Sequence, residues 1–186
     1  MRKTLSLVLM AVVLSGCTTV KRDSSATSAA PIPSVSETAI ASPVPSDTPS
    51  SAGKVGPATV TGDLGAEPMV QIDTTAAPVT QLIISDVAVG SGATVGPGST
   101  VTAHYAGYGA TTGTQFDSSW LRGEPATFPL NGVILGWQQG LQGMQVGGRR
   151  ILVIPANLGY GDTPPAGSGI QPGETLVFVV DLVDSK

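Results

Sequence analysis

The chain has 186 residues and a formal net charge of −4. It therefore lacks the excess of basic residues that binds a phosphate backbone, which argues against nucleic-acid binding. Glycine (24) and proline (15) are abundant, and aromatic residues make up only 4%. The length suits one ordinary domain with appended segments. Because this composition cannot supply one continuous core, the core of the domain must be concentrated in part of the chain.

Residues 1–16 have the features of an export signal. Arg2 and Lys3 precede an apolar run, residues 5–14, that is too short to span a bilayer comfortably. The Leu-Ser-Gly-Cys that follows resembles the bacterial lipobox, which implies that Cys17 is lipidated and becomes the first mature residue. We therefore expect an exported protein anchored through Cys17 to the cell membrane, with its folded part on the extracytoplasmic side.

The alternative is a plain secretory signal with an incidental cysteine. Cys17 is the only cysteine, so the chain has no internal disulfide and no cysteine-based metal or redox site. A lipid anchor gives this single residue a role, which favours lipidation.

Residues 17–66 are dominated by Ser, Thr, Ala, Pro and Gly and show no sustained apolar period. Burial of so few apolar side chains cannot offset the conformational entropy that the segment would lose on folding. We therefore expect a disordered tether. An O-glycosylated stalk fits the same composition. The folded domain is expected over residues 67–186.

Four segments of this domain read as strands, because they are rich in β-branched and aromatic residues and are bounded by turn formers. They are residues 81–90, 99–109, 149–155 and 174–183. Residues 109–113 (GATTG) read as a hairpin turn, and residues 90–98 as a loop without any nucleotide-binding motif.

One helix is expected from about Ile134 to Met144, with Ile134, Trp137, Leu141 and Met144 on a single face. Gly140 and Gly143 weaken this helix, so packing against the sheet must hold it. The fold class is therefore α+β, with an antiparallel sheet wrapped around one short helix.

Familiar catalytic sets are mostly excluded by the composition. His104 is the only histidine and is expected to be structural, so a histidine-based metal site or a Ser-His-Asp triad lacks its parts. No close carboxylate pair stands out for hydrolysis. The chemistry is therefore expected to be non-covalent, with no metal and no cofactor.

A set of apolar and aromatic residues near strand ends could line a ligand pocket, with Asp117 and Arg122 as nearby charged groups. The set is Tyr105, Phe116, Val133, Ile134, Trp137, Tyr160, Ile170 and Phe178. Any one of these residues alone is better explained as core, because large apolar residues are mostly buried for packing. The long Gly/Pro loop over residues 158–174 favours a functional site, because loops of this length are usually functional or disordered.

Five segments, taken in order, resemble the FKBP-type peptidyl-prolyl cis-trans isomerases. They are VTAHYAGY, TGTQFDSSWLRGEPATFPL, GVILGWQQGLQGMQVGGRRILVIP, GYG and GETLVFVVDL, within residues 80–184. The resemblance implies a five- or six-stranded antiparallel sheet around one short helix, with a proline pocket between them. It also implies an enzyme that isomerises X-Pro bonds, here in exported or cell-envelope proteins.

The resemblance also implies roles for individual residues. Trp137 would form the pocket floor, and the lining would comprise Tyr105, Phe116, Val133, Ile134 and Phe178. Tyr160, through its hydroxyl, and Ile134, through its backbone N–H, would donate to substrate carbonyls. Asp117, held by Arg122, would face the polarised carbonyl; the alternative for this pair is a surface ion pair contributing at most about 1 kcal/mol.

Two features depart from the best-known family members. Ala126 stands where many carry an aromatic pocket residue, and the loop over residues 162–174 is altered. The pocket should be more open beside Ala126 and this loop, unless the Trp120 side chain fills the space. This difference should affect substrate preference and the affinity for macrolides. The expected partners are proline-containing polypeptides, macrolide inhibitors and the membrane, and a monomer is expected.

Two other functions remain open beside a tethered foldase. One is a proline-recognition module with little or no turnover, and the other is a surface lipoprotein that uses the fold only as a scaffold. Retention of the whole pocket set argues against a scaffold.

Overall fold

The structure, a computed structural model, describes residues 53–186. The expected signal peptide, the lipidated Cys17 and residues 17–52 of the expected tether lie outside the described residues. Within residues 53–186, none of the helices has both the length and the apolar character needed to cross a membrane.

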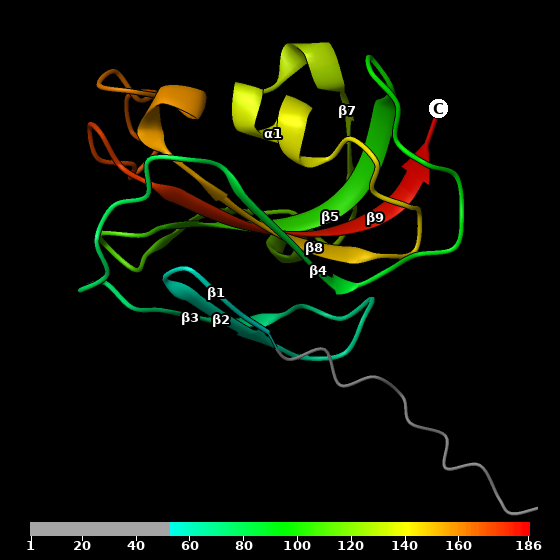
Figure 1. Cartoon of the computed structure of the whole chain (residues 1–186), viewed down its shortest axis with the longest axis horizontal. Coiled ribbons are helices and arrows are strands. Elements are labelled where there is room, and N and C mark those ends of the chain that lie inside the picture. Colours follow the sequence, from blue (N-terminus) through cyan, green and yellow to red (C-terminus); the bar gives the residue numbers. More distant parts are fainter. Residues whose placement is uncertain (1–52) are drawn as a thin grey trace, which may run out of the picture. The chain divides into compact units, whose positions relative to one another are not determined.

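A six-stranded antiparallel sheet organises the domain, in the order β4-β8-β9-β5-β6 with β7 also paired to β5 (Figure 1). Its strands are β4 Ile83–Ala88, β5 Thr100–Gly109, β6 Gln115–Ser118, β7 Ala126–Pro129, β8 Arg149–Ile154 and β9 Leu176–Ser185. All four strands expected from the sequence are present, and the GATTG turn joins β5 to β6. The α+β architecture with a six-stranded sheet is therefore confirmed.

Both faces of the two central strands β8 and β9 are buried. In β9, Phe178 and Val180 belong to the core on the helix side of the sheet, whereas Val177 and Val179 belong to a second core on the other side. Alternate side chains of a strand point to opposite faces, so a nearly continuous apolar run marks a strand that is covered twice. The run LVFVVDLV of β9 has this character.

The helix α1 (Leu135–Gly140) packs over one face of the sheet, where it faces β8 (Figure 1). It is shorter than the expected span from Ile134 to Met144, since Gly143 adopts a left-handed φ of 75° that ends helical geometry. Leu141 and Met144 are still buried as the periodicity predicts. Gly136 and Gly140 let α1 approach the sheet, because a Cβ at either position would lie within 2.6 Å of Ile154 or Leu152 side chains.

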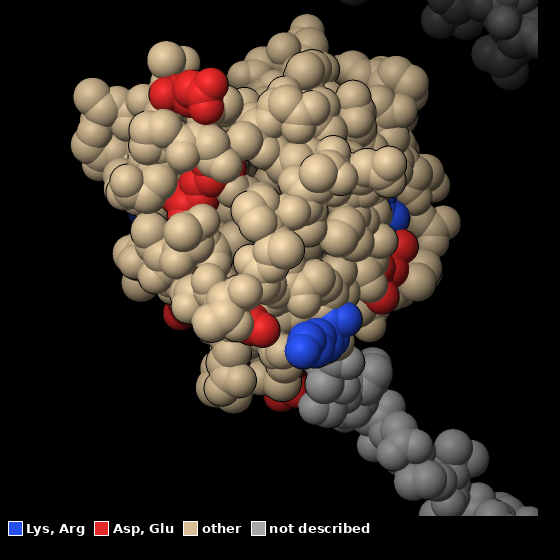
Figure 2. All heavy atoms as spheres, turned by 60° about the vertical axis from the view of Figure 1, so that its left-hand side comes forward, with Lys and Arg blue, Asp and Glu red and all other residues tan. Residues whose placement is uncertain are grey.

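Three short 3₁₀ segments complete the domain: η1 Trp120–Arg122, η2 Leu130–Gly132 and η3 Ala156–Leu158. Two of them lie next to the site in the chain, since η2 is joined to α1 by the two residues Val133 and Ile134, and η3 precedes Tyr160. Figure 2 shows a face of the molecule that is mostly uncharged. The acidic and basic side chains on this face form small separate groups.

A second, three-stranded sheet corrects the expected boundary of the tether. Its strands are β1 Gly53–Val55, β2 Ala58–Thr61 and β3 Met69–Ile72, and it lies on the face of the large sheet opposite α1 (Figure 1). Val55, Ala58 and Val60 are buried against Val177 and Val179. Residues 53–66 were expected to be disordered, but these few apolar residues suffice because a large apolar sheet face is available to receive them.

A buried ion pair fastens this N-terminal layer to the large sheet. The Arg149 guanidinium, with none of its side chain exposed, donates to both carboxylate oxygens of Asp181 at 2.5 and 2.7 Å. It also donates to the carbonyls of Gly62 and Ala66, while the Gly65 N–H donates to Asp181. The loop between β2 and β3 therefore satisfies donors and acceptors that the large sheet buries.

Candidate active site

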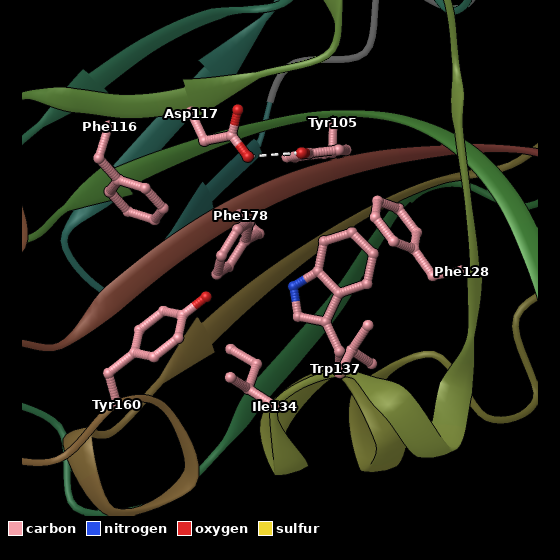
Figure 3. Close-up of a pocket in the computed structure, with 9 residues that line it drawn as sticks. Tyr105, Phe116, Asp117, Phe128, Ile134, Trp137, Tyr160 and Phe178 are labelled. Carbon is pink, nitrogen blue, oxygen red and sulfur yellow. Dashed lines mark hydrogen bonds between the residues drawn. The ribbon is translucent and has the colours of Figure 1, made fainter. Parts of the chain in front are cut away.

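A pocket of about 130 Å³ opens between α1 and the large sheet. Its lining comes from β5, β6, β7, β9, α1, the segment that enters α1, and the loop after η3 (Figure 3): Tyr105, Phe116, Asp117, Phe128, Val133, Ile134, Trp137, Tyr160 and Phe178. An apolar cavity of about 150 Å³ accommodates a benzene molecule. This pocket therefore has the size for one small apolar ring.

Trp137 forms the centre of the aromatic lining. Its ring stands nearly perpendicular to those of Tyr105, Phe128 and Phe178, with centroid distances of 5.4, 5.5 and 5.3 Å. Edge-to-face contacts of this kind stabilise aromatic clusters by about 0.5–1.5 kcal/mol per pair beyond burial. Only 4% of Trp137 is exposed, so the ring is held rigidly beneath the opening.

Gly107 on β5 makes room for two of the pocket rings. A Cβ at this position would lie 2.7 Å from Phe116 and 2.8 Å from Phe178. Real Cβ atoms do not approach rings this closely, so any larger residue would push both rings into the pocket.

The polar end of the pocket is a three-residue network. The Tyr105 hydroxyl donates to Asp117 at 2.5 Å (Figure 3), and Arg122 donates to Asp117 at 2.5 Å and to the Tyr105 hydroxyl oxygen at 2.7 Å. The Asp117–Arg122 pair is almost half exposed, so it adds little stability by itself. Its geometric effect is larger, because it holds one carboxylate and one phenol at the pocket wall.

The network holds its protonation state over a wide pH range. Burial acts to raise the pKa of Asp117, but hydrogen bonds from Tyr105 and Arg122, together with the guanidinium charge, outweigh it and lower that pKa below its ordinary value. Burial and the bond to Asp117 raise the pKa of Tyr105 to about 12. Asp117 is therefore a carboxylate and Tyr105 a neutral phenol at neutral pH.

Two donors in the pocket are free for a ligand. Among the described residues, neither the backbone N–H of Ile134 nor the Tyr160 hydroxyl has a protein acceptor. Tyr160 is 36% exposed, and Figure 3 shows its hydroxyl directed into the pocket. The chain reverses at Tyr160 because the N–H of Gly161 donates to the Ala156 carbonyl at 2.9 Å.

Most residues predicted from the sequence meet in this pocket. Arg122 does not line it but contacts Asp117 and Tyr105 at its edge. Ile170 is not among the lining residues either; it is buried in the same core on the helix side of the sheet as Tyr105 and Trp137, and its contact with a substrate stays a prediction.

Phe128 is the lining residue that the sequence interpretation missed. It follows Ala126 by two positions on β7, so both residues face the same side of that strand. This spacing could have identified Phe128 as the aromatic residue that accompanies Ala126. Trp120 does not lean in; it stacks on His104 with ring centroids 3.9 Å apart, away from the lining.

The site contains side chains for binding and orienting a peptide, and among residues 53–186 no three His, Cys, Asp or Glu side chains gather as metal ligands would. An antiparallel sheet closed by one short helix over an aromatic pocket is the architecture of a proline-binding isomerase domain. Comparison with known proteins agrees with this class.

Residues 92–183 match the family described as FKBP-type peptidyl-prolyl cis-trans isomerase. The chain is 49% identical over 120 residues to a probable FK506-binding protein of Corynebacterium glutamicum, covering 64% of this chain and 98% of that protein. It is 53% identical over 108 residues to an FK506-binding protein of Streptomyces anulatus, covering 57% of this chain and 87% of that protein.

Among solved structures, FkpA from Escherichia coli aligns with a TM-score of 0.52 and 43% identity, covering 57% of this chain and 49% of that one. The chain belongs to the FKBP-type peptidyl-prolyl cis-trans isomerase family. The N-terminal layer over residues 53–72 precedes the segment that matches the family.

Proposed function

We propose that this pocket binds the proline ring of an X-Pro segment over Trp137 and catalyses rotation about the preceding peptide bond. The observation that carries the proposal is one small aromatic pocket that also presents the Asp117 carboxylate and two free donors. The same pocket would take the proline-like rings of macrolide inhibitors, since relatives are named for binding FK506.

The chemistry needs no nucleophile, because no bond to carbon is broken. Resonance gives the peptide bond a rotational barrier of about 18–20 kcal/mol, and X-Pro bonds isomerise unaided in tens to hundreds of seconds. In the twisted transition state the amide loses resonance and becomes less charge-separated. A dry aromatic site therefore favours the twisted state over the planar, more polar ground state.

Three groups would orient the substrate around this rotation. The Ile134 N–H and the Tyr160 hydroxyl would donate to carbonyls on either side of the proline, so that the peptide is fixed while one amide turns. Asp117 would face the rotating carbonyl carbon. Its hydrogen bonds to Tyr105 and Arg122 keep the carboxylate in a single orientation.

The first test is the isomerisation rate of a short Leu-Pro peptide, measured by NMR exchange with the full chain and two variants. We expect Asp117→Ala to lower kcat/KM by about 10- to 100-fold, because two charge-assisted contacts are lost. Tyr160→Phe should lower kcat/KM by about three- to tenfold through loss of one neutral hydrogen bond.

Matched controls are available for both variants. Asp184→Ala removes a surface carboxylate that pairs with Lys186, and Tyr108→Phe removes a hydroxyl that belongs to the opposite face of the sheet. Both controls should retain the parent rate. A parent chain that binds the peptide without accelerating exchange would contradict catalysis and leave the second candidate, a proline-recognition module.

We also propose that the domain is exported and tethered by a lipidated Cys17, so that its substrates are X-Pro bonds of exported or cell-envelope proteins. The sequence supports this through residues 1–17, and the residues after Cys17 would act as a spacer. The first described strand, β1, lies on the face of the large sheet opposite α1 (Figure 1), so a tether would join the domain on the side away from the helix that carries Trp137.

Expression of the full chain in a bacterium tests the anchor. The parent is expected in the membrane fraction, with a mature N-terminal peptide whose mass includes acyl chains on Cys17, because multiple chains make membrane binding stable. Cys17→Ser should move the protein to the soluble exported fraction. Recovery of unmodified parent in the soluble fraction would refute lipidation.

A further inference from the structure

The peptide group between Val133 and Ile134 has an unusual position in the fold. It lies in the two-residue link between η2 and α1, outside any helix or strand. Among the described residues, no backbone N–H donates to the Val133 carbonyl, and the Ile134 N–H on the same peptide plane has no protein acceptor. Backbone hydrogen bonding therefore does not fix the orientation of this plane.

The side chain of Gln138 supplies the missing contact. Its amide nitrogen Nε2 donates to the Val133 carbonyl oxygen at 2.8 Å, while its backbone N–H donates to the Ile134 carbonyl oxygen at 3.2 Å. Gln138 thus holds the two carbonyls that flank Ile134. The Gln138 side chain is half-buried and does not line the pocket.

We propose that Gln138 is a positioning residue for the isomerase reaction, acting through the Val133–Ile134 peptide group to aim the Ile134 N–H at a substrate carbonyl. This inference rests on the proposed role of the Ile134 N–H as a donor to substrate. A peptide group is planar, so fixing its carbonyl oxygen also fixes the direction of its N–H.

The contact also affects the strength of the donor. A hydrogen bond accepted by the carbonyl of a peptide group polarises that group and strengthens donation by its N–H. Loss of the contact should therefore weaken the hold on both the planar and the twisted substrate. An interaction that is equal in both states appears in KM, whereas kcat is left nearly unchanged.

Two substitutions in the full chain separate this role from simple packing. Gln138→Met keeps the length of the side chain but removes the donor. Gln138→Glu keeps the shape and places an acceptor against the carbonyl at neutral pH, yet it regains an O–H donor when the carboxyl is protonated. Gln139→Met is the matched control, because Gln139 lies on the same helix and is exposed.

We expect Gln138→Met to raise KM for a Leu-Pro peptide by about five- to tenfold, and to shift the Ile134 amide proton to higher field in NMR spectra. Gln139→Met should stay within about twofold of the parent, the usual size of a surface substitution effect. For Gln138→Glu, the KM ratio to the parent should fall towards one between pH 7.5 and pH 4, since glutamate titrates near about 4.3. Any protonation of Asp117, whose pKa is lowered below its ordinary value, affects parent and variant alike, so the KM ratio at each pH removes its contribution.

Two results would overturn the inference. The first is an unchanged KM and an unshifted Ile134 amide resonance in Gln138→Met, and the second is a defect in Gln138→Glu that acidification does not relieve. Titration of the parent with the peptide distinguishes the underlying causes. If peptide shifts the Ile134 amide resonance of the parent and Gln138→Met has the KM of the parent, only the proposed role of Gln138 is wrong. If peptide does not shift the Ile134 amide resonance of the parent, the proposed contact between the Ile134 N–H and the substrate is wrong as well.

Discussion

Deleting residues 53–66 is expected to lower the free energy of unfolding by about 3–6 kcal/mol. The deletion removes Val55 and Val60, and burial of each valine contributes about 1.5–3 kcal/mol. It also leaves Val177 and Val179 on the central strand β9 facing water. The loss should be measured by urea unfolding of the full chain and of chains that begin at Gly53 and at Glu67.

The chain that begins at Gly53 is the control for this deletion, since it keeps β1 and β2 intact. It should unfold at the same urea concentration as the full chain, whereas the chain that begins at Glu67 should unfold much earlier. Equal midpoints for the two shortened chains would show that the N-terminal layer does not stabilise the domain.

The N-terminal layer also affects the site, because it supports the strand that carries Phe178. Val177 and Val179 lie against the layer, while Phe178 between them forms a wall of the pocket. The loop between β2 and β3 in addition satisfies two donors of the buried Arg149. Measurements of activity should therefore use chains that begin at or before Gly53.

The large sheet could be predicted from the sequence because its strands are long, apolar and rich in β-branched residues. The ten-residue strands β5 and β9 pair along most of their length, and each falls within two residues of its expected position. Strand signals of this strength depend on local composition, which a single sequence contains.

The N-terminal layer could not be predicted in the same way. Its strands have three or four residues, and its buried positions are Val55, Ala58 and Val60 within a polar segment. Such strands are stable only against an existing apolar surface. That surface is formed by β8 and β9, more than 80 residues further along the chain, and its availability is a property of the tertiary structure.

The resemblance identified most of the pocket, but contacts specific to this chain required the structure. Phe128 lies in a strand that the sequence interpretation did not delimit, and its place in the lining follows from the pairing of β7 with β5. The contact of Gln138 with the Val133 carbonyl depends on the chain direction between η2 and α1. The Gln138 contact has no sequence pattern of its own, and the spacing of Ala126 and Phe128 indicates a shared face only once β7 is known to be a strand.

Trp137→Ala should have the largest effect on the site, because this ring is both the floor of the pocket and the centre of its aromatic packing. We expect a loss of about 3–5 kcal/mol in the free energy of unfolding, as for other buried tryptophans. Loss of the surface beneath the proline ring should also lower kcat/KM by about 10- to 100-fold, since burying one apolar group contributes about 1.5–3 kcal/mol. Urea unfolding and NMR exchange of a Leu-Pro peptide measure the two effects.

Leu141→Ala separates the two effects of Trp137→Ala. Leu141 is fully buried just after α1 but does not line the pocket, so this variant should lose about 2–5 kcal/mol of stability and keep the parent kcat/KM per folded molecule. The assays should be run at a temperature at which both variants are folded. If both variants lost activity in proportion to their stability, Trp137 would act only as core; a loss confined to Trp137→Ala would show that proline binds on its ring.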